Sequence, residues 1–600
     1  MNFSYFIKKS MAVTAALFTA LSLTSCIDLF NFLEDEDFSE PTFYSDYEIS
    51  EADTDNFISL GSSSTIRLSG DTSGSPKGKA IYYVNFNLSN STTIKTSNLR
   101  YVKNYSGITS TTDTSILRSA ENSETTNISL EPEIKKCHYT APVLIEESAK
   151  FPAARTTSTE DTPSVTYNDF KIGTTKNLFV DIDYSDSSDF TFGEKTARLC
   201  AKTEKCLVWV IEDYYSETAS GAKVNKAVAE AIAEKFTEYY DIERQIFGEE
   251  EDGIFVKSQG LKANSTYGSL VNIVIYDIGN DANKSNSEKC GIAGYFYSKD
   301  YYSGYTNSVF KYSNCGKFFY IDSEFCNANK DEGETVSSDI ITTLFHEFQH
   351  MINFKTKSIS GIDSSTWYNE MLSMLAEDMF ATPLNLSQAV WDTRLPYFNN
   401  YYFLSGITEY NTSNPLPSYS TAYTLGAFLA RNFGGIKLIS EISQNGTGDM
   451  ESILNAIKTV TGEDISSTQL FQRFIQSVVF KSTYAEENSL PTLYTAADSK
   501  TYNSKTISMP ALDLYSDDFS YQVNDKTLLG PLLFGSKQTS YPNLTSSGST
   551  LSNALRPNGF YIHYVGKATS DTVTLEFSSQ VSSAEQVYII LQDPVKNTTN

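Results

Sequence analysis

Two histidines and a glutamate lie within five positions of one another near the middle of the chain. His346, Glu347 and His350 form the pattern His-Glu-x-x-His. In an α-helix, side chains four positions apart lie one turn above each other, so both imidazoles can reach a single zinc ion. The glutamate lies beside them, where it can take a proton from metal-bound water. With only four histidines in 600 residues, chance rarely produces this pattern.

The residues around the pattern predict a helix with one buried face. Apolar residues recur at helical spacing, at Ile341, Leu344, Phe345, Phe348 and Ile352. Ser338 is placed to cap the start of this helix, and Asp339 suits its first turn. The pattern therefore predicts a helix that holds both histidines on one side.

A catalytic zinc site usually takes three protein ligands and keeps one position open, so a third ligand is expected from a neighbouring element. The segment 367–377 has apolar residues at helical spacing on one face, whereas Glu370, Ser373 and Glu377 lie on the other. Glu370 follows His350 by 20 positions, which leaves room for a helix end, a loop and a returning helix.

Two histidines on one helix followed by Asn-Glu on the next resemble the gluzincin metallopeptidases. Trp367-x-Asn369-Glu370 is similar to the Trp-Leu-Asn-Glu of their aminopeptidase branch, and Glu377, seven positions on, matches the second acidic residue of that branch. The resemblance implies that Glu370 is the third zinc ligand and that Glu377 orients a ligand histidine. Met374 stands where the thermolysin type has an aspartate.

A further match concerns a tyrosine. Residues 423–429 resemble the Tyr-x-x-Gly-x-x-Leu segment of the same branch, whose tyrosine hydrogen-bonds the tetrahedral oxyanion. The resemblance implies that Tyr423 is this donor, with Tyr419 as the second candidate. The chain has 39 tyrosines, so a packing role at the start of a helix is the alternative for Tyr423.

The middle of the chain, residues 165–480, resembles the hyicolysin-like family of secreted bacterial metalloproteases. The similar segments are Gly294–Phe296 followed by Asp300, Ser313-Asn314 before 320–322, and the stretch 346–354. The resemblance implies a zinc endopeptidase, although the substrate does not follow from it. With one catalytic zinc ion at the site, we expect Glu347 to act as the general base. The expected substrates are extracellular proteins or peptides. The Gly-x-Met-Glu-Asn segment with which aminopeptidases hold a free amino terminus is missing upstream, which favours internal cleavage.

Two other functions remain open. One is a zinc aminopeptidase on the same scaffold. The other is a catalytically inactive surface adhesin or binding lipoprotein. The intact set of His346, Glu347, His350 and Glu370 speaks against the second, because a binding module gains nothing from all four.

The order of apolar runs predicts a multi-domain protein. We expect an α+β zincin-like (gluzincin) core at 166–365 and a helical C-terminal catalytic subdomain at 366–484. Short strand-like runs in Ser- and Thr-rich sequence predict an N-terminal β-sandwich-like module at 55–165 and a C-terminal one at 485–600. An extended substrate is expected to add to an exposed sheet edge near 317–321.

The start of the chain has the features of a secretory signal. Lys8 and Lys9 precede a short apolar run, Met11–Leu23, which is too short to cross a bilayer comfortably. The following Leu-Thr-Ser-Cys resembles the lipobox of bacterial lipoproteins. It implies cleavage of a signal peptide at 1–25 and lipidation of Cys26. We then expect an acidic tether at 26–54 and a protein anchored to a membrane of the bacterial cell envelope, facing outside the cytoplasm.

Net charge bears on the binding partners, and the cysteine content bears on disulfides and metal sites. Lys and Arg number 46 against 73 Asp and Glu, a formal net charge of −27, so nucleic acid is not an expected partner. The cysteines beyond Cys26 permit up to three disulfides outside the cytoplasm. They are Cys137, Cys200, Cys206, Cys290, Cys315 and Cys326. None forms a CxxC pair, so a cysteine-type zinc site is not expected.

Overall fold

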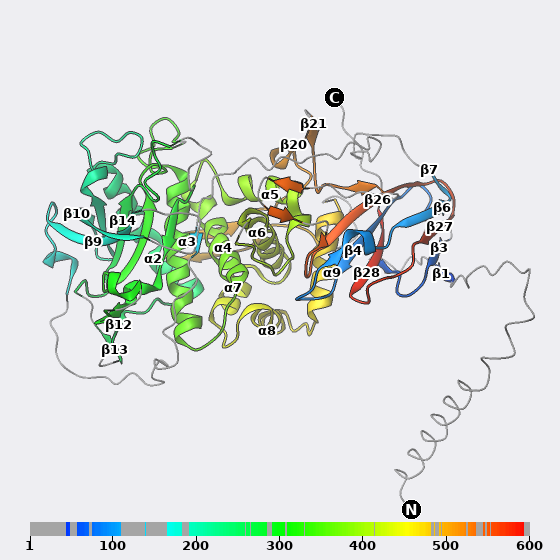
Figure 1. Ribbon diagram of the computed structural model, residues 1–600, viewed down its shortest axis with the longest axis horizontal. Coiled ribbons are helices and arrows are strands. Elements are labelled where there is room, and N and C mark those ends of the chain that lie inside the picture. Colours follow the sequence, from blue (N-terminus) through cyan, green and yellow to red (C-terminus); the bar gives the residue numbers. More distant parts are fainter. Residues whose placement is uncertain are drawn as a thin grey trace, which may run out of the picture.

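The computed structural model describes most of the chain from residue 57 onward and leaves out most of its start. The described residues are 44–48, 57–70, 75–109, 138–139, 165–182, 191–257, 260–263, 266–284, 291–306, 309–328, 330–412, 414–481, 485, 491–493, 495–523, 526–535, 544–546, 549–551 and 554–592. The expected signal peptide and Cys26 lie outside them. Part of the predicted tether forms a strand, β1 (Tyr44–Glu48), which pairs in parallel with β3 (Thr65–Ser69). The described chain is a mixed α/β, multi-domain protein (Figure 1).

A seven-stranded sheet lies at one end of the molecule (Figure 1). Its order is β8 (His138–Tyr139), β15 (Gly294–Phe296), β17 (Lys317–Asp322), β14 (Val271–Tyr276), β11 (Cys206–Ile211), β10 (Phe192–Lys202) and β9 (Thr175–Asp181). The central strands β11, β14 and β17 are parallel and buried at every position, which their continuous apolar sequences favour. β15 runs antiparallel to β17, and β8 pairs in parallel with the other side of β15.

The histidine-bearing helix packs against this sheet. α3 (Ser338–Asn353) is buried along its whole length and contacts β15, β17 and the long helix α2 (Lys226–Phe247). Its cap is Ser337, whose hydroxyl accepts a hydrogen bond from the Ile340 N–H at 3.3 Å, so the prediction of Ser338 was displaced by one residue. Helix ends are set by local geometry that spacing alone does not specify.

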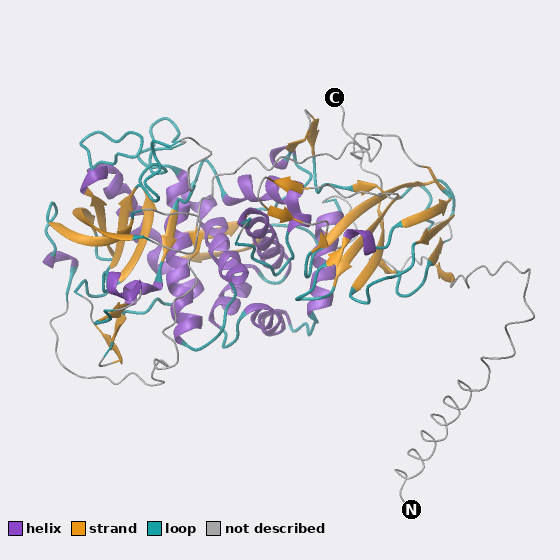
Figure 2. Cartoon of the chain, viewed as in Figure 1, coloured by secondary structure: helices purple, strands orange, loops and turns teal. Residues whose placement is uncertain are grey.

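Helices fill the middle of the molecule (Figure 2). They are α4 (Thr366–Leu384), α5 (Val390–Tyr401), α6 (Pro415–Asn432), α7 (Gly435–Gln444), α8 (Asp449–Thr461) and α9 (Ser467–Val479). α4 packs between α3 and α6, and α5 packs on α6. The hairpin of β18 (Ala497–Tyr502) and β19 (Lys505–Met509) also contacts α4 and α7, although its sequence lies in the predicted C-terminal β module.

The two predicted β modules form a single sandwich, which corrects the expectation of separate N- and C-terminal modules. One sheet has the order β1-β3-β27-β6, and the other has the order β2-β28-β4-β26-β22. The further strands are β2 (Phe57–Ser59), β4 (Ala80–Asn87), β6 (Val102–Ser106), β22 (Phe534–Gly535), β26 (Phe560–Ala568), β27 (Thr572–Phe577) and β28 (Glu585–Gln592). Val84 of β4 lies opposite Ile562 on one side and Tyr588 on the other. Alternating residues predict a strand with a buried face but do not identify its neighbour.

Smaller groups of strands complete the described strands. They are β12 (Gly253–Val256) with β13 (Gly260–Ala263) and β16 (Tyr302–Ser303), β5 (Ile94–Lys95) with β25 (Ala554–Leu555), β7 (Ile108–Thr109) on β26, β20 (Tyr521–Val523) with β21 (Lys526–Leu528), and β23 (Leu544–Ser546) with β24 (Ser549–Leu551). Within the described part, no helix is both long and apolar enough to cross a bilayer.

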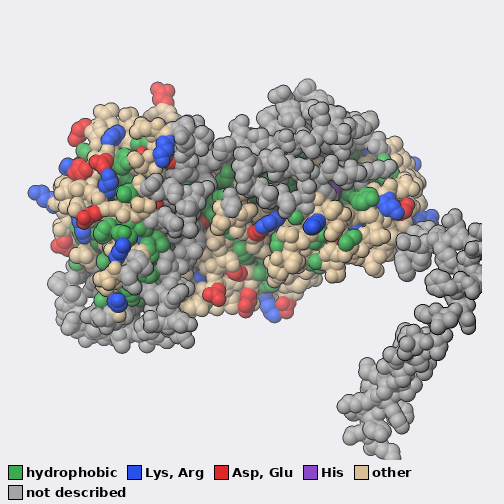
Figure 3. All heavy atoms as spheres, in the orientation of Figure 1, with side chains coloured by type: hydrophobic (Ala, Val, Ile, Leu, Met, Phe, Trp, Pro, Cys, Tyr) green, Lys and Arg blue, Asp and Glu red, His purple; other side chains and the backbone are tan. Residues whose placement is uncertain are grey.

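On the face drawn in Figure 3, acidic and basic side chains are interspersed over the end that holds the seven-stranded sheet.

The described cysteines are free thiols. Cys200, Cys206 and Cys326 are buried and Cys315 is partly exposed, and none of them is bonded to another cysteine. Cys137 and Cys290 lie outside the described residues. The expectation of up to three disulfides is therefore not met by these four residues.

Candidate metal centre

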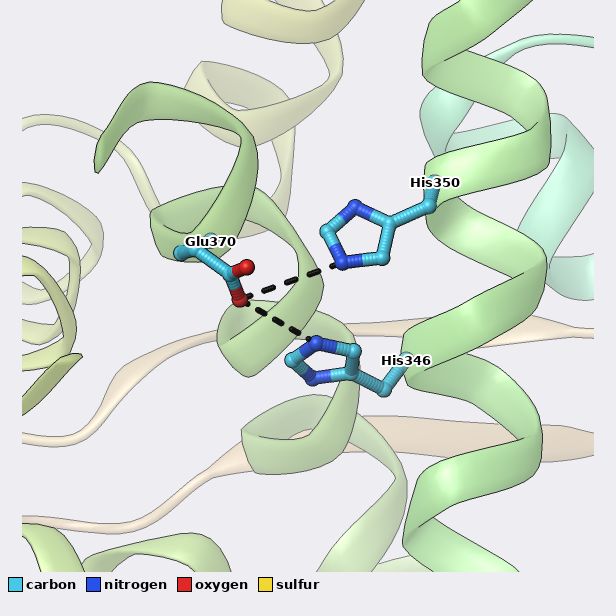
Figure 4. Close-up of side chains that lie close together, drawn as sticks. All are labelled: His346, His350 and Glu370. Carbon is cyan, nitrogen blue, oxygen red and sulfur yellow. Dashed lines mark ion pairs between the residues drawn. The ribbon is translucent and has the colours of Figure 1, made fainter. Parts of the chain in front are cut away.

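Side chains from α3 and α4 converge at one point (Figure 4). The Oε2 atom of Glu370 lies 3.2 Å from Nε2 of His346 and 3.8 Å from Nε2 of His350. One donor atom from each of the three residues lies within 4.8 Å of the other two, and all three side chains are buried. The predicted helix–loop–helix path thus brings Glu370 to the histidine pair.

The composition of this cluster fits a metal ion. Two imidazole nitrogens and one carboxylate oxygen are donors that zinc and related divalent metals bind. Burial raises the pKa of Glu370, and its hydrogen bond to His346 and the charge of that residue oppose the rise. Glu347 and Glu377 are buried close by. A group of buried carboxylates is unfavourable without a cation to compensate it, so the cluster is suited to hold one.

Glu347 lies between α3 and strand β15. Burial raises its pKa well above the usual range, and the nearby His346 and a hydrogen bond from the Phe296 backbone oppose that rise. A Cβ added at Gly294 would lie 2.6 Å from Cγ2 of Thr343 and 3.2 Å from Cγ of Glu347. β15 therefore passes so close to α3 that this position has no room for a larger side chain.

Each histidine is oriented through its other ring nitrogen. Nδ1 of His346 lies 2.8 Å from Oε1 of Glu377. Nδ1 of His350 lies 2.9 Å from the hydroxyl of Ser373, which donates its proton to Oε1 of Gln349 at 2.5 Å. Because a hydroxyl has a single proton, Ser373 accepts from the Nδ1–H of His350. This arrangement turns the Nε2 lone pair of His350 toward Glu370.

The structure distinguishes the two candidate tyrosines. Tyr423 donates to Oδ2 of Asp378 at 2.9 Å, and Asp378 also pairs with Arg431 at 3.1 Å, so Tyr423 is held away from the ligand cluster. Tyr419, one turn earlier on α6, donates to Oε1 of Glu370 at 3.4 Å. Residues four apart share a helix face, so sequence spacing could not decide which turn of α6 meets the cluster.

Two residues near the cluster had no predicted role. Ser373 was placed only on the polar face of its helix, and that position is the single indication the sequence contains. Arg394 belongs to α5, and its guanidinium carbon lies 5.0 Å from the centroid of the Tyr419 ring. A lone arginine in an ordinary helical segment carries no motif, so its position could be known only from the packing of α5 on α6.

A histidine pair on a helix against a mixed sheet, with a glutamate from the next helix, defines a metallopeptidase-type centre. A model of the Peptidase M30 family matches residues 195–496, half of the chain, and this range includes every residue of the cluster. The chain therefore belongs to the peptidase M30 family.

A curated relative supports the same assignment. The neutral metalloprotease ShpI of Staphylococcus hyicus is 26% identical over 263 residues, which cover 42% of this chain and 51% of the relative. The match thus spans about half the length of that relative. The resemblance to hyicolysin-like metalloproteases is confirmed.

Proposed function

We propose that this protein is a zinc-dependent endopeptidase with a gluzincin-type core. The observation that carries the proposal is the convergence of His346, His350 and Glu370, with Glu347 beside them. These three residues would hold one zinc ion, and Glu377 and Ser373 would fix the two imidazole rings. Zinc held there acts as a Lewis acid and lowers the pKa of water toward neutrality.

The protein's own residues then divide the remaining work. Glu347 takes a proton from the attacking water and returns it to the departing amine, a role that typically contributes about 10²–10⁴-fold. Tyr419, next to Glu370, is our preferred donor to the oxyanion in place of Tyr423. Arg431, Asp378 and Tyr423 form a buried group that joins α6 to α4.

The sheet edge for an extended substrate differs from the one predicted. β17 (Lys317–Asp322) is an internal strand between β14 and β15, so the expectation of an exposed edge at 317–321 was wrong. β15 is the strand next to Glu347, and its outer side would offer main-chain groups for an added strand only in the absence of β8. In the structure, β8 pairs with that side.

The cellular setting rests on the start of the chain. The lipobox-like sequence that ends in Cys26 supports a protein anchored by lipid to a bacterial envelope membrane and facing outward. Extracellular proteins and peptides would be the substrates accessible from there.

The test combines metal analysis with turnover. We expect the purified protein to contain about one zinc per chain and to cleave casein and an internally quenched peptide, and a chelator should abolish both cleavages. Glu347→Gln should keep zinc and lose turnover, whereas His350→Ala should lose both. Full turnover by Glu347→Gln would refute the assigned base. Cleavage of only an amino-terminal chromogenic substrate would establish the aminopeptidase alternative.

A further inference from the structure

Arg394 is a buried arginine without a hydrogen-bond or ion-pair partner among the described residues. Its side chain is 4% exposed, its Nε atom is sealed from solvent with no hydrogen-bond partner, and within the described chain its guanidinium forms no ion pair. The other two arginines that are buried in the described part of the chain have polar partners. Arg100 donates to the carbonyl oxygen of Gly61 at 2.9 Å, and Arg431 pairs with Asp378 at 3.1 Å. A buried guanidinium without a hydrogen-bonded or oppositely charged partner is unfavourable. Arg394 is therefore suited to bind a ligand.

The surroundings of Arg394 place it at the metal centre. Its guanidinium carbon lies 5.0 Å from the centroid of the Tyr419 ring, and the hydroxyl of Tyr419 reaches Oε1 of Glu370. The positive charge of Arg394 also counters the rise in the pKa of Glu370 and of Tyr410 that burial causes. Arg394 is therefore close enough to act on a substrate bound at the cluster, although it contacts neither histidine in any ion pair or hydrogen bond.

A guanidinium in this position has a specific chemical preference. Its planar fork of N–H groups matches the two oxygens of a carboxylate, and such bidentate pairs are among the strongest hydrogen bonds in proteins. The nearest acid in the cluster, Glu370, is already engaged by His346 and Tyr419. An incoming carboxylate would satisfy Arg394 without disturbing those contacts.

We propose that Arg394 binds a carboxylate of the substrate close to the scissile bond and so makes the enzyme selective for peptides that carry one there. The carboxylate belongs either to an acidic side chain or to a free carboxyl terminus. This inference rests on the proposed peptidase function and extends it to a substrate class.

The experiment compares matched peptides on the zinc-loaded full chain. One pair of internally quenched peptides differs only by Glu or Gln next to the cleaved bond, and a second pair differs only by a free or amidated carboxyl terminus. Wild-type kcat/KM should be about 10- to 100-fold higher for the carboxylate member of one pair, as expected for a hydrogen-bonded charge pair. The pair that shows the difference identifies the source of the carboxylate.

Variants assign that preference to Arg394. Arg394→Gln should remove it, with a loss of tenfold or more on the carboxylate peptide and little change on its neutral partner. Arg394→Lys should retain part of it, because the charge remains while the bidentate geometry is lost. The control is Arg473→Gln, since Arg473 pairs with Glu463 on the surface and is not near the cluster. Zinc content and thermal unfolding of each variant are measured alongside.

A binding measurement separates this inference from the proposed function. In Glu347→Gln protein, fluorescence anisotropy of the labelled peptides reports affinity without turnover. Weaker binding of only the carboxylate peptide after Arg394→Gln supports the inference, even if the wild-type protein proves unable to cleave any peptide. Equal losses on both members of each pair, or a loss of zinc with Arg394→Gln, would overturn it, because Arg394 would then serve the metal centre itself. If Arg394→Gln does not fold, the comparison of wild type with Arg394→Lys decides.

Discussion

The hydroxyl of Ser373 determines the tautomer of His350, one of the residues proposed to bind the metal. This hydroxyl accepts a hydrogen bond from the Nδ1–H of His350 and donates one to Oε1 of Gln349. In this tautomer the His350 Nε2 lone pair is available to a metal. The Glu377 carboxylate does the same for His346, although by charge as well as by hydrogen bonding.

Removing this hydroxyl should weaken metal binding more than it weakens folding. We expect Ser373→Ala to lower zinc affinity by about 10- to 100-fold, with Ser373→Thr retaining more of it. Competition with a chromophoric chelator measures the change. Ser443→Ala is the matched control, because the hydroxyl of Ser443 is equally buried but donates to the carbonyl oxygen of Phe247. Equal zinc affinities for Ser373→Ala and Ser443→Ala would show that Ser373 does not position His350.

The two tyrosines of α6 should give opposite results when each loses its hydroxyl. Tyr419→Phe is expected to keep zinc and stability but to lower kcat by about 10²–10³-fold, as loss of an oxyanion donor does. Tyr423→Phe should leave kcat nearly unchanged and lower the free energy of unfolding by about 1–3 kcal/mol, because the buried Asp378 loses a donor. Kinetics and thermal unfolding of both variants check this. The reverse pattern would restore Tyr423 as the catalytic candidate.

At the level of elements, the strands β4 and β28 are joined by a buried acid. Oε1 of Glu585 accepts hydrogen bonds from Nδ2 of Asn85 and from the backbone N–H of Arg100, both at 2.8 Å. Burial nevertheless raises the pKa of Glu585 from its ordinary 4.5 to about 6. The folded state therefore binds this proton more tightly than the unfolded state does.

This shift has a definite consequence for stability. Because the pKa is higher in the folded state, the contribution of Glu585 to the free energy of unfolding is most favourable below pH 4.5 and falls as the pH rises to about 6. The total decrease in the free energy of unfolding is about 2 kcal/mol. Glu585→Gln should remove this slope and leave the sandwich as stable or more stable at pH 7. Calorimetric unfolding of both proteins from pH 4 to pH 7 tests the sign, and a wild-type advantage that grows with pH would contradict it.

The residues of the metal centre were largely predictable, whereas the packing around it was not. Helical spacing alone places His346 and His350 on one side of α3, and the resemblance to known metallopeptidases identified Glu370. Ser373, Tyr419 and Arg394 depend on how α4, α5 and α6 are rotated about their axes. That rotation is set by side-chain packing between helices, which no single segment encodes.

The same limit applies to the strands. The apolar runs at 207–211 and 271–276, within the segment predicted as an α+β core, form the buried strands β11 and β14. The edge expected at β17 proved internal because β15, only three residues long, adds beside it. Strand partners in a sheet are decided by pairing between segments distant in sequence. A strand pattern alone therefore predicts that a strand forms but not its place in the sheet.

At the scale of the whole molecule, the two ends of the chain meet in one sandwich. β4 from the N-terminal region lies between β26 and β28 from the C-terminal region, and β27 lies between β3 and β6. In sequence, the helical and seven-stranded parts are therefore inserted between the two segments that form the sandwich, whereas in space they lie beside it (Figure 1). Short strand-like runs in both flanking segments were correctly predicted to form strands where the structure describes them. The pairing of segments so distant in sequence has no local sequence signal.

The short strand β8 bears on how an extended peptide would bind near the metal centre. Its pairing with β15 places His138 opposite Tyr295 and Tyr139 opposite Phe296. One side of a strand can bond to only one neighbour at a time, so any peptide that approaches β15 in extended form competes with the protein's own backbone. The observed affinity for such a peptide is then the intrinsic affinity multiplied by the fraction of molecules in which β8 has left. The pairing of two residues, remote in sequence from the histidines, would thus lower the affinity of the centre for an extended peptide.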